Sequence, residues 1–214
     1  MKRKRLSHIR KYLLFILLIG LASGCATGPY PTYYSYTDEN GYNTIVEIDG
    51  IVYKQAPGNW GIDIEQRGGK LGYLDDTSKI IYEIQGDSSR NYLYAQVGKG
   101  YLAYFEKDFI FPEVSVDSVN MIHWWDSNKT RDITDHETIQ LFFSEVSNGT
   151  SISEHGNWWV FGQLYCYIEQ FPGVYYTYQI ITYNGMYACS DFSQDNYVDI
   201  SKDLVEKLAG YEIN

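Results

Sequence analysis

The sequence has no hydrophobic run long enough to cross a membrane. Its longest apolar stretch extends from Tyr12 to Ala22, or 11 residues, whereas a transmembrane helix needs about 20. Six lysines and arginines and no acidic residue precede this stretch. A basic start followed by a short apolar segment is typical of a signal peptide. We therefore expect residues 1–24 to be removed during export.

The signatures of common hydrolases and nucleotide-binding proteins are also missing. There is no Gly-x-Ser-x-Gly elbow, no His-Glu-x-x-His zinc motif and no phosphate-binding glycine loop. The glycines of "RGGKLG" (67–72) predict a turn. The pairs Asp75/Asp76 and Asp132/Asp135 are carboxylates of the type that glycosidases use, but spacing along a chain does not give their separation in space. We predict no catalytic residue, no metal site and no cofactor, and an enzyme is the less favoured interpretation.

Basic residues become scarce once the signal peptide is gone. The chain from Cys25 onward keeps 11 Lys+Arg against 27 Asp+Glu, a net charge of −16. Such a surface repels phosphate backbones and anionic lipid headgroups, so we expect no nucleic-acid partner. Cationic peptides would be attracted, although the charge is also sufficient simply to keep an exported protein soluble.

Small residues, Ala22, Ser23 and Gly24, directly precede Cys25. This stretch resembles the lipobox of bacterial lipoproteins, although Ala22 stands where that family usually has a branched aliphatic residue. The resemblance implies that Cys25 carries a diacylglyceryl group and begins the mature chain, which is then held on the extracytoplasmic side of the cell membrane. Two acyl chains matter because one gives only reversible binding. An ordinary secretory signal followed by an incidental cysteine is the alternative.

Longer strings such as "GKLGYLDDTSKIIYEIQGD" and "PGVYYTYQIITYNG" resemble those of uncharacterised surface lipoproteins from Gram-positive bacteria. The likeness is one of general texture and implies no activity. The chain contains 22 tyrosines, and aromatic and β-branched residues favour sheets. We expect an α+β fold with mainly antiparallel sheets and two short helices packed on the C-terminal sheet.

The chain divides into four expected segments. They are a signal peptide (1–24), a tether (25–43), an N-terminal β-meander region (44–112) and a C-terminal α+β region (113–214). In the meander we predict an Asp49-Gly50 hairpin and strands at 79–85, 92–97 and 101–106. The C-terminal region is predicted to begin with a strand at 118–125 and to continue with a sheet from Trp158 to Ser190.

Two helices are predicted in the C-terminal region. The first, in "ITDHETIQLFFSEVSNG", has a Thr134/Glu137 capping box and a left-handed stop at Gly149. Its buried stripe is formed by Ile139, Phe142, Phe143 and Val146. The second, in "SKDLVEKLAG", begins at the cap Ser201 and ends at Gly210, with Leu204, Val205 and Leu208 on one side.

With Cys25 acylated, Cys166 and Cys189 remain, and we predict that both are free thiols. If the turns at Pro172-Gly173 and Asn184-Gly185 each have two residues, the cysteines face neighbouring residues of the strand between them. They then lie on opposite faces and about 9.5 Å apart across two strand spacings. A disulfide requires Cα atoms within about 7 Å.

The same register collects aromatic side chains on one face of the C-terminal sheet. The face includes Phe161, and its candidate ligand-binding residues are Trp159, Tyr165, Tyr167, Tyr176, Tyr178 and Tyr187. The opposite, aliphatic face is predicted to lie beneath the first helix. Tyrosine rings with hydroxyls at their edges suit a glycan or a peptide. The alternative is that these rings form a second layer of core.

We therefore expect a lipid-anchored extracytoplasmic binding or accessory protein. A hydrolase acting on cell-wall or nutrient polymers is one alternative and would need a concave site with converging carboxylates or a polarised histidine. A protein that sequesters cationic peptides is another and would need a continuous acidic face.

Overall fold

The structure is a computed structural model that describes residues 30–37, 44–152, 158–191 and 197–213. The expected signal peptide (1–24), Cys25 and residues 26–29 and 38–43 of the expected tether lie outside these ranges. From Thr32 onward the chain forms one compact unit. None of the helices in the described ranges has the length and apolar character needed to span a bilayer. The fold is α+β, with mainly antiparallel sheets and two short helices.

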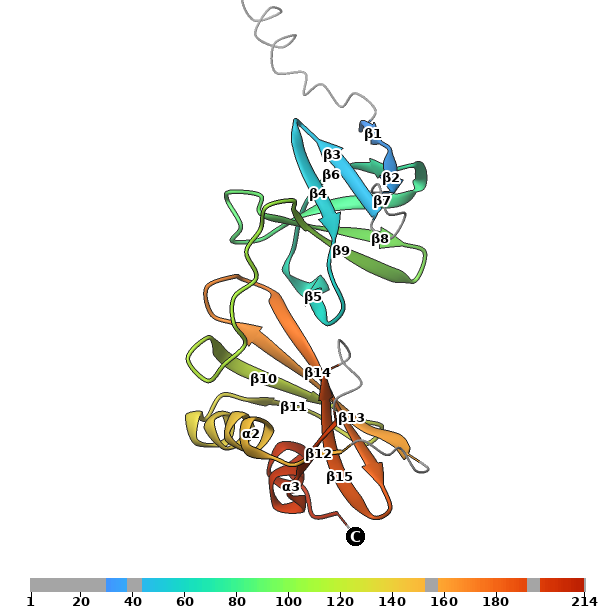
Figure 1. Ribbon diagram of the computed structural model, residues 1–214. Coiled ribbons are helices and arrows are strands. Elements are labelled where there is room, and N and C mark those ends of the chain that lie inside the picture. Colours follow the sequence, from blue (N-terminus) through green and yellow to red (C-terminus); the bar gives the residue numbers. More distant parts are fainter. Residues whose placement is uncertain (1–29, 38–43, 153–157, 192–196, 214) are drawn as a thin grey trace, which may run out of the picture. The chain divides into compact units, whose positions relative to one another are not determined.

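The first sheet has eight strands in the order β1-β6-β7-β8-β9-β4-β3-β2 (Figure 1). Its strands are β1 (Thr32–Tyr33), β2 (Ser35–Thr37), β3 (Thr44–Ile48), β4 (Ile51–Gln55), β6 (Arg67–Leu74), β7 (Asp76–Ile84), β8 (Tyr92–Val97) and β9 (Gly100–Glu106). β1 runs parallel to β6, and the other neighbours are antiparallel. β1 and β2 lie within the expected tether, so part of that segment belongs to the sheet. β6 includes the glycines that predicted a turn, and that prediction is wrong.

The Asp49-Gly50 hairpin is confirmed. Asp49 has a φ of 53° and Gly50 a φ of 84°, as a two-residue turn of this kind requires. Ile48 pairs with Ile51 across it. The core of this sheet draws buried side chains from six strands, namely Val46, Ile48, Tyr53, Leu74, Ile81, Leu93, Ala95 and Tyr104.

The second sheet has the order β11-β10-β13-β14-β15-β16-β12. Its strands are β10 (Val119–Trp125), β11 (Thr130–Ile133), β12 (Ser151–Ile152), β13 (Trp158–Ile168), β14 (Val174–Tyr183), β15 (Met186–Asp191) and β16 (Tyr197–Ile200). A further strand, β5 (Trp60–Ile62), comes from the N-terminal half of the sequence and pairs with the start of β14. It is followed by a single 3₁₀ turn, η1 (Ile64–Gln66). The N-terminal half therefore supplies a strand to the C-terminal sheet.

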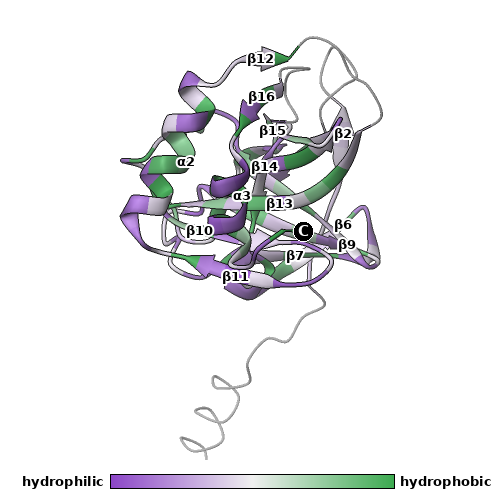
Figure 2. Cartoon of the chain, turned by 90° about the horizontal axis from the view of Figure 1, so that it is seen from below, coloured by the Kyte–Doolittle hydropathy of each residue, from purple (hydrophilic) through white to green (hydrophobic). Residues whose placement is uncertain are grey.

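Two helices, α2 (His136–Asn148) and α3 (Lys202–Ala209), lie on one face of the second sheet (Figure 1). Hydrophobic and hydrophilic residues alternate along α2 (Figure 2), and its buried face includes Ile139, Phe142 and Phe143, as predicted. Both helices pack into one core with β10, β13, β14 and β15.

The ends of α3 are as predicted, but those of α2 are not. Ser201 caps α3, and Gly210 ends it with a left-handed φ of 71°. α2 is capped by Asp135, whose carboxylate accepts a hydrogen bond from the Thr138 N–H at 2.9 Å, rather than by Thr134. Gly149 has a φ of −67°. It is needed for a different reason, because a Cβ there would collide with Val198 and the Asp199 carbonyl.

The register between β13 and β14 differs from the prediction. The turn at Asn184-Gly185 has two residues and sets Cys189 opposite Ile180, as predicted. The connection at Pro172-Gly173 is longer, so that Cys166 faces Tyr176 instead of Gln179. This shift of three residues exchanges the two faces of β13 relative to β14, because side chains alternate with a period of two.

Cys166 and Cys189 are both buried and free, so the predicted free thiols are confirmed. The predicted separation onto opposite faces is wrong, because both side chains belong to the core beneath the helices. Burial raises the pKa of both thiols, so neither is a reactive thiolate at neutral pH.

Candidate ligand-binding site

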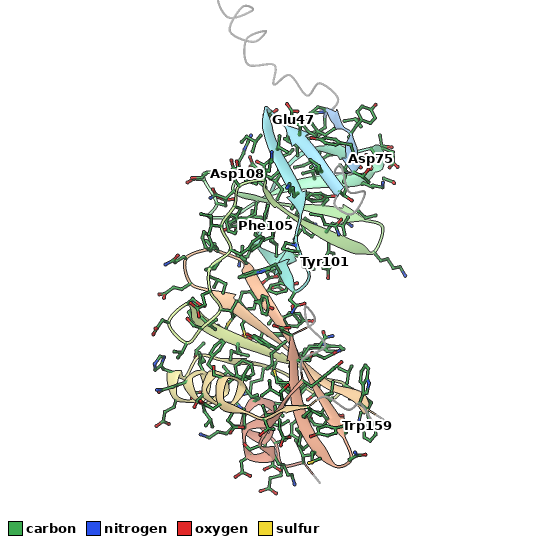
Figure 3. All side chains as sticks on the ribbon, viewed as in Figure 1. Glu47, Asp75, Tyr101, Phe105, Asp108 and Trp159 are labelled. Carbon is green, nitrogen blue, oxygen red and sulfur yellow. The ribbon has the colours of Figure 1, made fainter. Side chains whose placement is uncertain are left out.

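The corrected register divides the six predicted ligand-binding residues between the two faces of the second sheet. Tyr176, Tyr178 and Tyr187 pack with the core under the helices. Tyr165 and Tyr167 lie on the opposite face and line a hollow. Trp159 is 61% exposed near the start of β13, far from this hollow along the strand (Figure 3). The six residues therefore do not share one surface.

The hollow on the helix-free face has a volume of about 230 Å³ and is called the tyrosine hollow below. It lies where β9, β10, β13 and β14 meet the end of β5 and the start of η1. Its lining residues are Ile62, Asp63, Ile64, Tyr101, His123, Tyr165, Tyr167 and Tyr175. Figure 3 shows Tyr101 extending from β9.

Three tyrosine rings of the hollow are in contact, edge to face between Tyr165 and Tyr175 and tilted between Tyr167 and Tyr175. The ring centroids of Tyr165 and Tyr175 are 5.0 Å apart, and those of Tyr167 and Tyr175 are 5.6 Å apart. Gly61 permits this arrangement, since a Cβ there would overlap the Tyr175 ring. Such rings present flat apolar surface and lose little side-chain entropy when a ligand binds.

Hydrogen bonds fix two of these rings. The Tyr167 hydroxyl donates to Oδ2 of Asp63 at 3.1 Å, and the Tyr165 hydroxyl donates to Oε1 of Gln163 at 2.7 Å. Burial, and then the Asp63 carboxylate, raises the pKa of Tyr167. Burial raises the pKa of Tyr175 to about 12. All three rings therefore keep their hydroxyl protons at neutral pH.

A polarised histidine lies on the wall of the tyrosine hollow. Nδ1 of His123 is 2.6 Å from Oδ1 of Asp132 on the neighbouring strand β11. The His123 ring also contacts Tyr165, with centroids 6.0 Å apart. Because Asp132 engages Nδ1, the Nε2 atom is the ring nitrogen that is left for a ligand or a water molecule.

The other acidic pairs considered from the sequence stabilise the fold. Asp75 accepts hydrogen bonds from the Ser35 N–H and hydroxyl and from Lys79. Burial alone would raise the pKa of Asp75, but these bonds hold it below its ordinary value. Asp76 bonds to Ser78, and Asp135 caps α2. Within the described ranges no three His, Cys, Asp or Glu side chains are grouped closely enough to hold a metal ion.

An acidic hollow of about 660 Å³ lies beside α2 and α3. It is the feature closest to the acidic face that a sequestering protein would need. Two of its carboxylates are already engaged, because Glu145 accepts from the Ser201 N–H and hydroxyl and Glu206 accepts from the Ile213 N–H. The bonds of Glu145 join α2 to the cap of α3, and the bond of Glu206 holds the C-terminal residues on α3. Fewer charges are therefore left for a cationic peptide.

Four polar or aromatic members of the hollow were not predicted from the sequence, namely Asp63, Tyr101, His123 and Tyr175. His123 lies in a strand that was predicted from the sequence. Its contact with Asp132 could not be predicted, because it depends on the register between β10 and β11. Tyr175 lies opposite Tyr167 and would have been assigned to this face if the register between β13 and β14 had been predicted correctly. Asp63 and Tyr101 come from the N-terminal half, so their place beside the second sheet is a long-range feature of the fold.

Comparison with protein-family models finds none that matches the chain, and comparisons with curated proteins and with solved structures find no match either.

Proposed function

We propose that this protein is a lipid-anchored extracytoplasmic binding protein whose ligand occupies the tyrosine hollow. The anchor follows from the signal-peptide layout and from the lipobox-like residues before Cys25. The hollow supplies the binding function. The observation that carries the proposal is that three mutually packed tyrosines and a polarised histidine converge on one concave surface.

The hollow has the properties of a prepared binding site. The hydroxyls of Tyr165 and Tyr167 are held by Gln163 and Asp63, so these two rings do not need to be ordered when a ligand arrives. Tyr101 is 49% exposed and offers its ring to solvent. A few fixed polar groups beside apolar rings are typical of pockets that take a sugar or a short peptide.

The site is tested by Tyr101→Ser, with Tyr36→Ser as the matched control, because Tyr36 is equally exposed, at 50%, on β2. The probes are a soluble peptidoglycan digest and a pool of short peptides, followed by saturation-transfer NMR. We expect the wild type and Tyr36→Ser to take up one of these probes and Tyr101→Ser to bind it at least tenfold more weakly. Equal binding by Tyr101→Ser, or no binding by the wild type, would contradict the proposal.

The anchor has its own test. Cys25→Ser should release the protein from the membrane fraction or leave it unprocessed, because the acyl chains and not charge hold an acidic chain to a membrane. Unchanged membrane retention with normal cleavage would show that lipidation is not the anchor.

The His123–Asp132 pair favours one further candidate, a hydrolase in which His123 acts as a general base. None of the described residues that line the hollow is a serine or a cysteine that could serve as a nucleophile, so the base would have to activate water. His123→Asn would then abolish turnover of the peptidoglycan digest with little loss of binding. If the wild type shows no turnover and His123→Asn binds the digest more weakly, His123 contacts the ligand and is not a general base.

A further inference from the structure

A second hollow adjoins the tyrosine hollow and shares two of its walls. Ile64 and Tyr101 line both. The second has a volume of about 390 Å³, and its remaining lining residues are Glu65, Arg67, Tyr94, Gln96 and Lys99. We call it the basic hollow. The tyrosine hollow alone is smaller than pockets that enclose small-molecule ligands, about 300–1,000 Å³, whereas the two together fall within that range. The pair thus suits an elongated ligand.

A series of aromatic rings connects the two hollows. Tyr82 and Tyr94 face each other across β7 and β8, with centroids 5.8 Å apart. The Tyr94 and Tyr101 centroids are 5.5 Å apart. Tyr101 then borders the tyrosine hollow with Tyr165 and Tyr175. Tyr94 is only 3% exposed, so its ring supports Tyr101 rather than facing a ligand. Tyr101 lines both hollows, and its exposed ring gives a flat apolar surface where the two meet.

The charges of the two hollows differ in whether they are already paired. In the tyrosine hollow, Asp63 accepts bonds from the Tyr167 hydroxyl and the Glu65 N–H, and Asp132 is bonded to His123. In the basic hollow no described residue forms an ion pair with Arg67 or Lys99.

The geometry of the basic hollow favours an anionic group on the ligand. The Arg67 guanidinium lies 5.0 Å from the centroid of the Tyr82 ring, within the range of a cation–π contact. The planar fork of arginine matches a carboxylate or a phosphate. Glu65 offsets one of the two positive charges of Arg67 and Lys99, so the side chains of the hollow carry an excess of one positive charge.

Pairing of the strands argues against a bound peptide. A peptide that binds by its main chain adds a strand to a free sheet edge. β10, β13 and β14, which form the floor of the tyrosine hollow, each have neighbours on both sides. Recognition there depends on side chains, that is, on ring faces and a few polar groups.

We propose that the two hollows together bind one acidic oligosaccharide, with sugar rings against Tyr101 and Tyr175 and a carboxylate or phosphate at Arg67 and Lys99. This inference rests on the proposed function, since it names the ligand class of the same site. The overall negative charge of the chain slows the approach of such a ligand, but screening over about 8 Å at physiological salt leaves the local cations to decide binding.

The test is calorimetric titration with four probes. They are tetragalacturonate, its fully methyl-esterified form, maltotetraose and phosphorylated maltotetraose. We expect each acidic probe that binds to do so at least tenfold more tightly than its uncharged counterpart. Arg67→Ala/Lys99→Ala should remove this advantage. Lys107→Ala/Lys202→Ala is the control, because it also removes two positive charges from exposed sites, and both lie outside the two hollows. Preference for the uronate or for the phosphate identifies the source of the anionic group.

The outcomes separate this inference from the proposed function. Equal binding of charged and uncharged probes, weakened by Tyr101→Ser, would overturn the anionic preference and leave the tyrosine hollow as a binding site. Binding of the peptide pool alone would overturn the glycan class in the same way. If none of the glycans or peptides binds, or if Tyr101→Ser changes nothing, both proposals fail. The single variant Lys99→Ala repeats the test with a smaller change. An unchanged melting temperature shows that each variant is folded.

Discussion

The two sheets bury their hydrophobic residues in different ways. The first sheet collects side chains from six of its strands around one core, and no described helix contributes to it. The second places α2 and α3 over one face. Its other face, around β10, β13 and the start of β14, carries the tyrosine hollow. The first sheet thus buries this core with side chains of its own strands, whereas the second, covered by helices on a single side, retains a face on which a hollow forms.

The sheets are not independent, because a third core contains residues from both. Ile62, Ile84, Tyr92 and Phe105 from the N-terminal half surround Val174 of β14. The Tyr92 hydroxyl also donates to the Pro172 carbonyl at 3.0 Å. These contacts hold β5 and η1 beside the second sheet, and this position brings Asp63 into the hollow.

The largest effect is expected from Phe142→Ala, which empties a fully buried site between α2 and the second sheet. We expect a loss of about 4 kcal/mol in the free energy of unfolding. Urea unfolding is followed by tryptophan fluorescence, since all five tryptophans lie in β5 or the second sheet, and by circular dichroism, which reports both sheets. Coincident transitions are expected because of the shared core. Loss of the fluorescence transition alone would show that the sheets unfold separately.

A loss of about 3 kcal/mol is expected from Asp126→Asn. Asp126 is 6% exposed, and its carboxylate accepts bonds from the Trp124 indole, the Tyr211 hydroxyl and two backbone N–H groups. Burial alone would raise its pKa, but these bonds lower it below the ordinary value. In Asp126→Asn, an NH₂ group replaces one carboxylate oxygen and then faces N–H and O–H groups that are themselves donors.

The pH dependence of Asp126 has a definite sign. A lowered folded pKa stabilises the protein above the unfolded pKa of about 3.9, and this stabilisation is lost as the pH falls through the folded pKa. The stability gap between wild type and Asp126→Asn should therefore be full at pH 6 and narrow below about pH 4. Asp108→Asn, at an exposed site (Figure 3), is the control. A gap that does not change with pH would contradict this role for the carboxylate.

The sequence predicts the tight turns of the fold correctly where two residues alone determine the turn. The Asp49-Gly50 and Asn184-Gly185 turns were predicted with the correct register, because two residues with positive φ leave little choice. The Pro172-Gly173 connection allows several lengths. Its length depends on packing around Val174, which is buried between the halves of the chain. The division of the tyrosines between faces could not be predicted without that length.

The candidate site was less predictable than the fold. Tyr165 and Tyr167 were identified, but their partners Tyr101 and Asp63 lie far away in sequence and reach the hollow through the pairing of β5 with β14. β6 was missed because its glycines indicate a turn. The structure gives a reason for one of them, since a Cβ at Gly68 would press on the Glu83 backbone of the neighbouring strand.

A smaller effect, about 2 kcal/mol, is expected from Gly61→Ala, because the new methyl group overlaps the Tyr175 ring. The ring must move, so the hollow on the second sheet changes shape while the core of the first sheet is untouched. Near-ultraviolet circular dichroism and glycan titration should both change. Gly69→Ala is the matched control, because a Cβ there meets only the end of the Glu83 side chain. Normal binding by Gly61→Ala would show that the position of Tyr175 does not matter.

The smallest effect tests whether the first sheet is sealed. Tyr104 is 2% exposed and its hydroxyl has no hydrogen-bond partner among the described residues, whereas the hydroxyl of the equally buried Tyr53 donates to the Arg90 carbonyl at 2.8 Å. Tyr53→Phe should cost about 1 kcal/mol through the lost bond. Tyr104→Phe should instead raise the free energy of unfolding by up to about 1 kcal/mol, because it removes a buried polar group that is not paired. Both values come from urea unfolding. If Tyr104→Phe destabilises the protein, the Tyr104 hydroxyl is hydrogen-bonded in solution. Where that partner is water, the core of the first sheet admits solvent, and its contrast with the second sheet is weaker than the fold indicates.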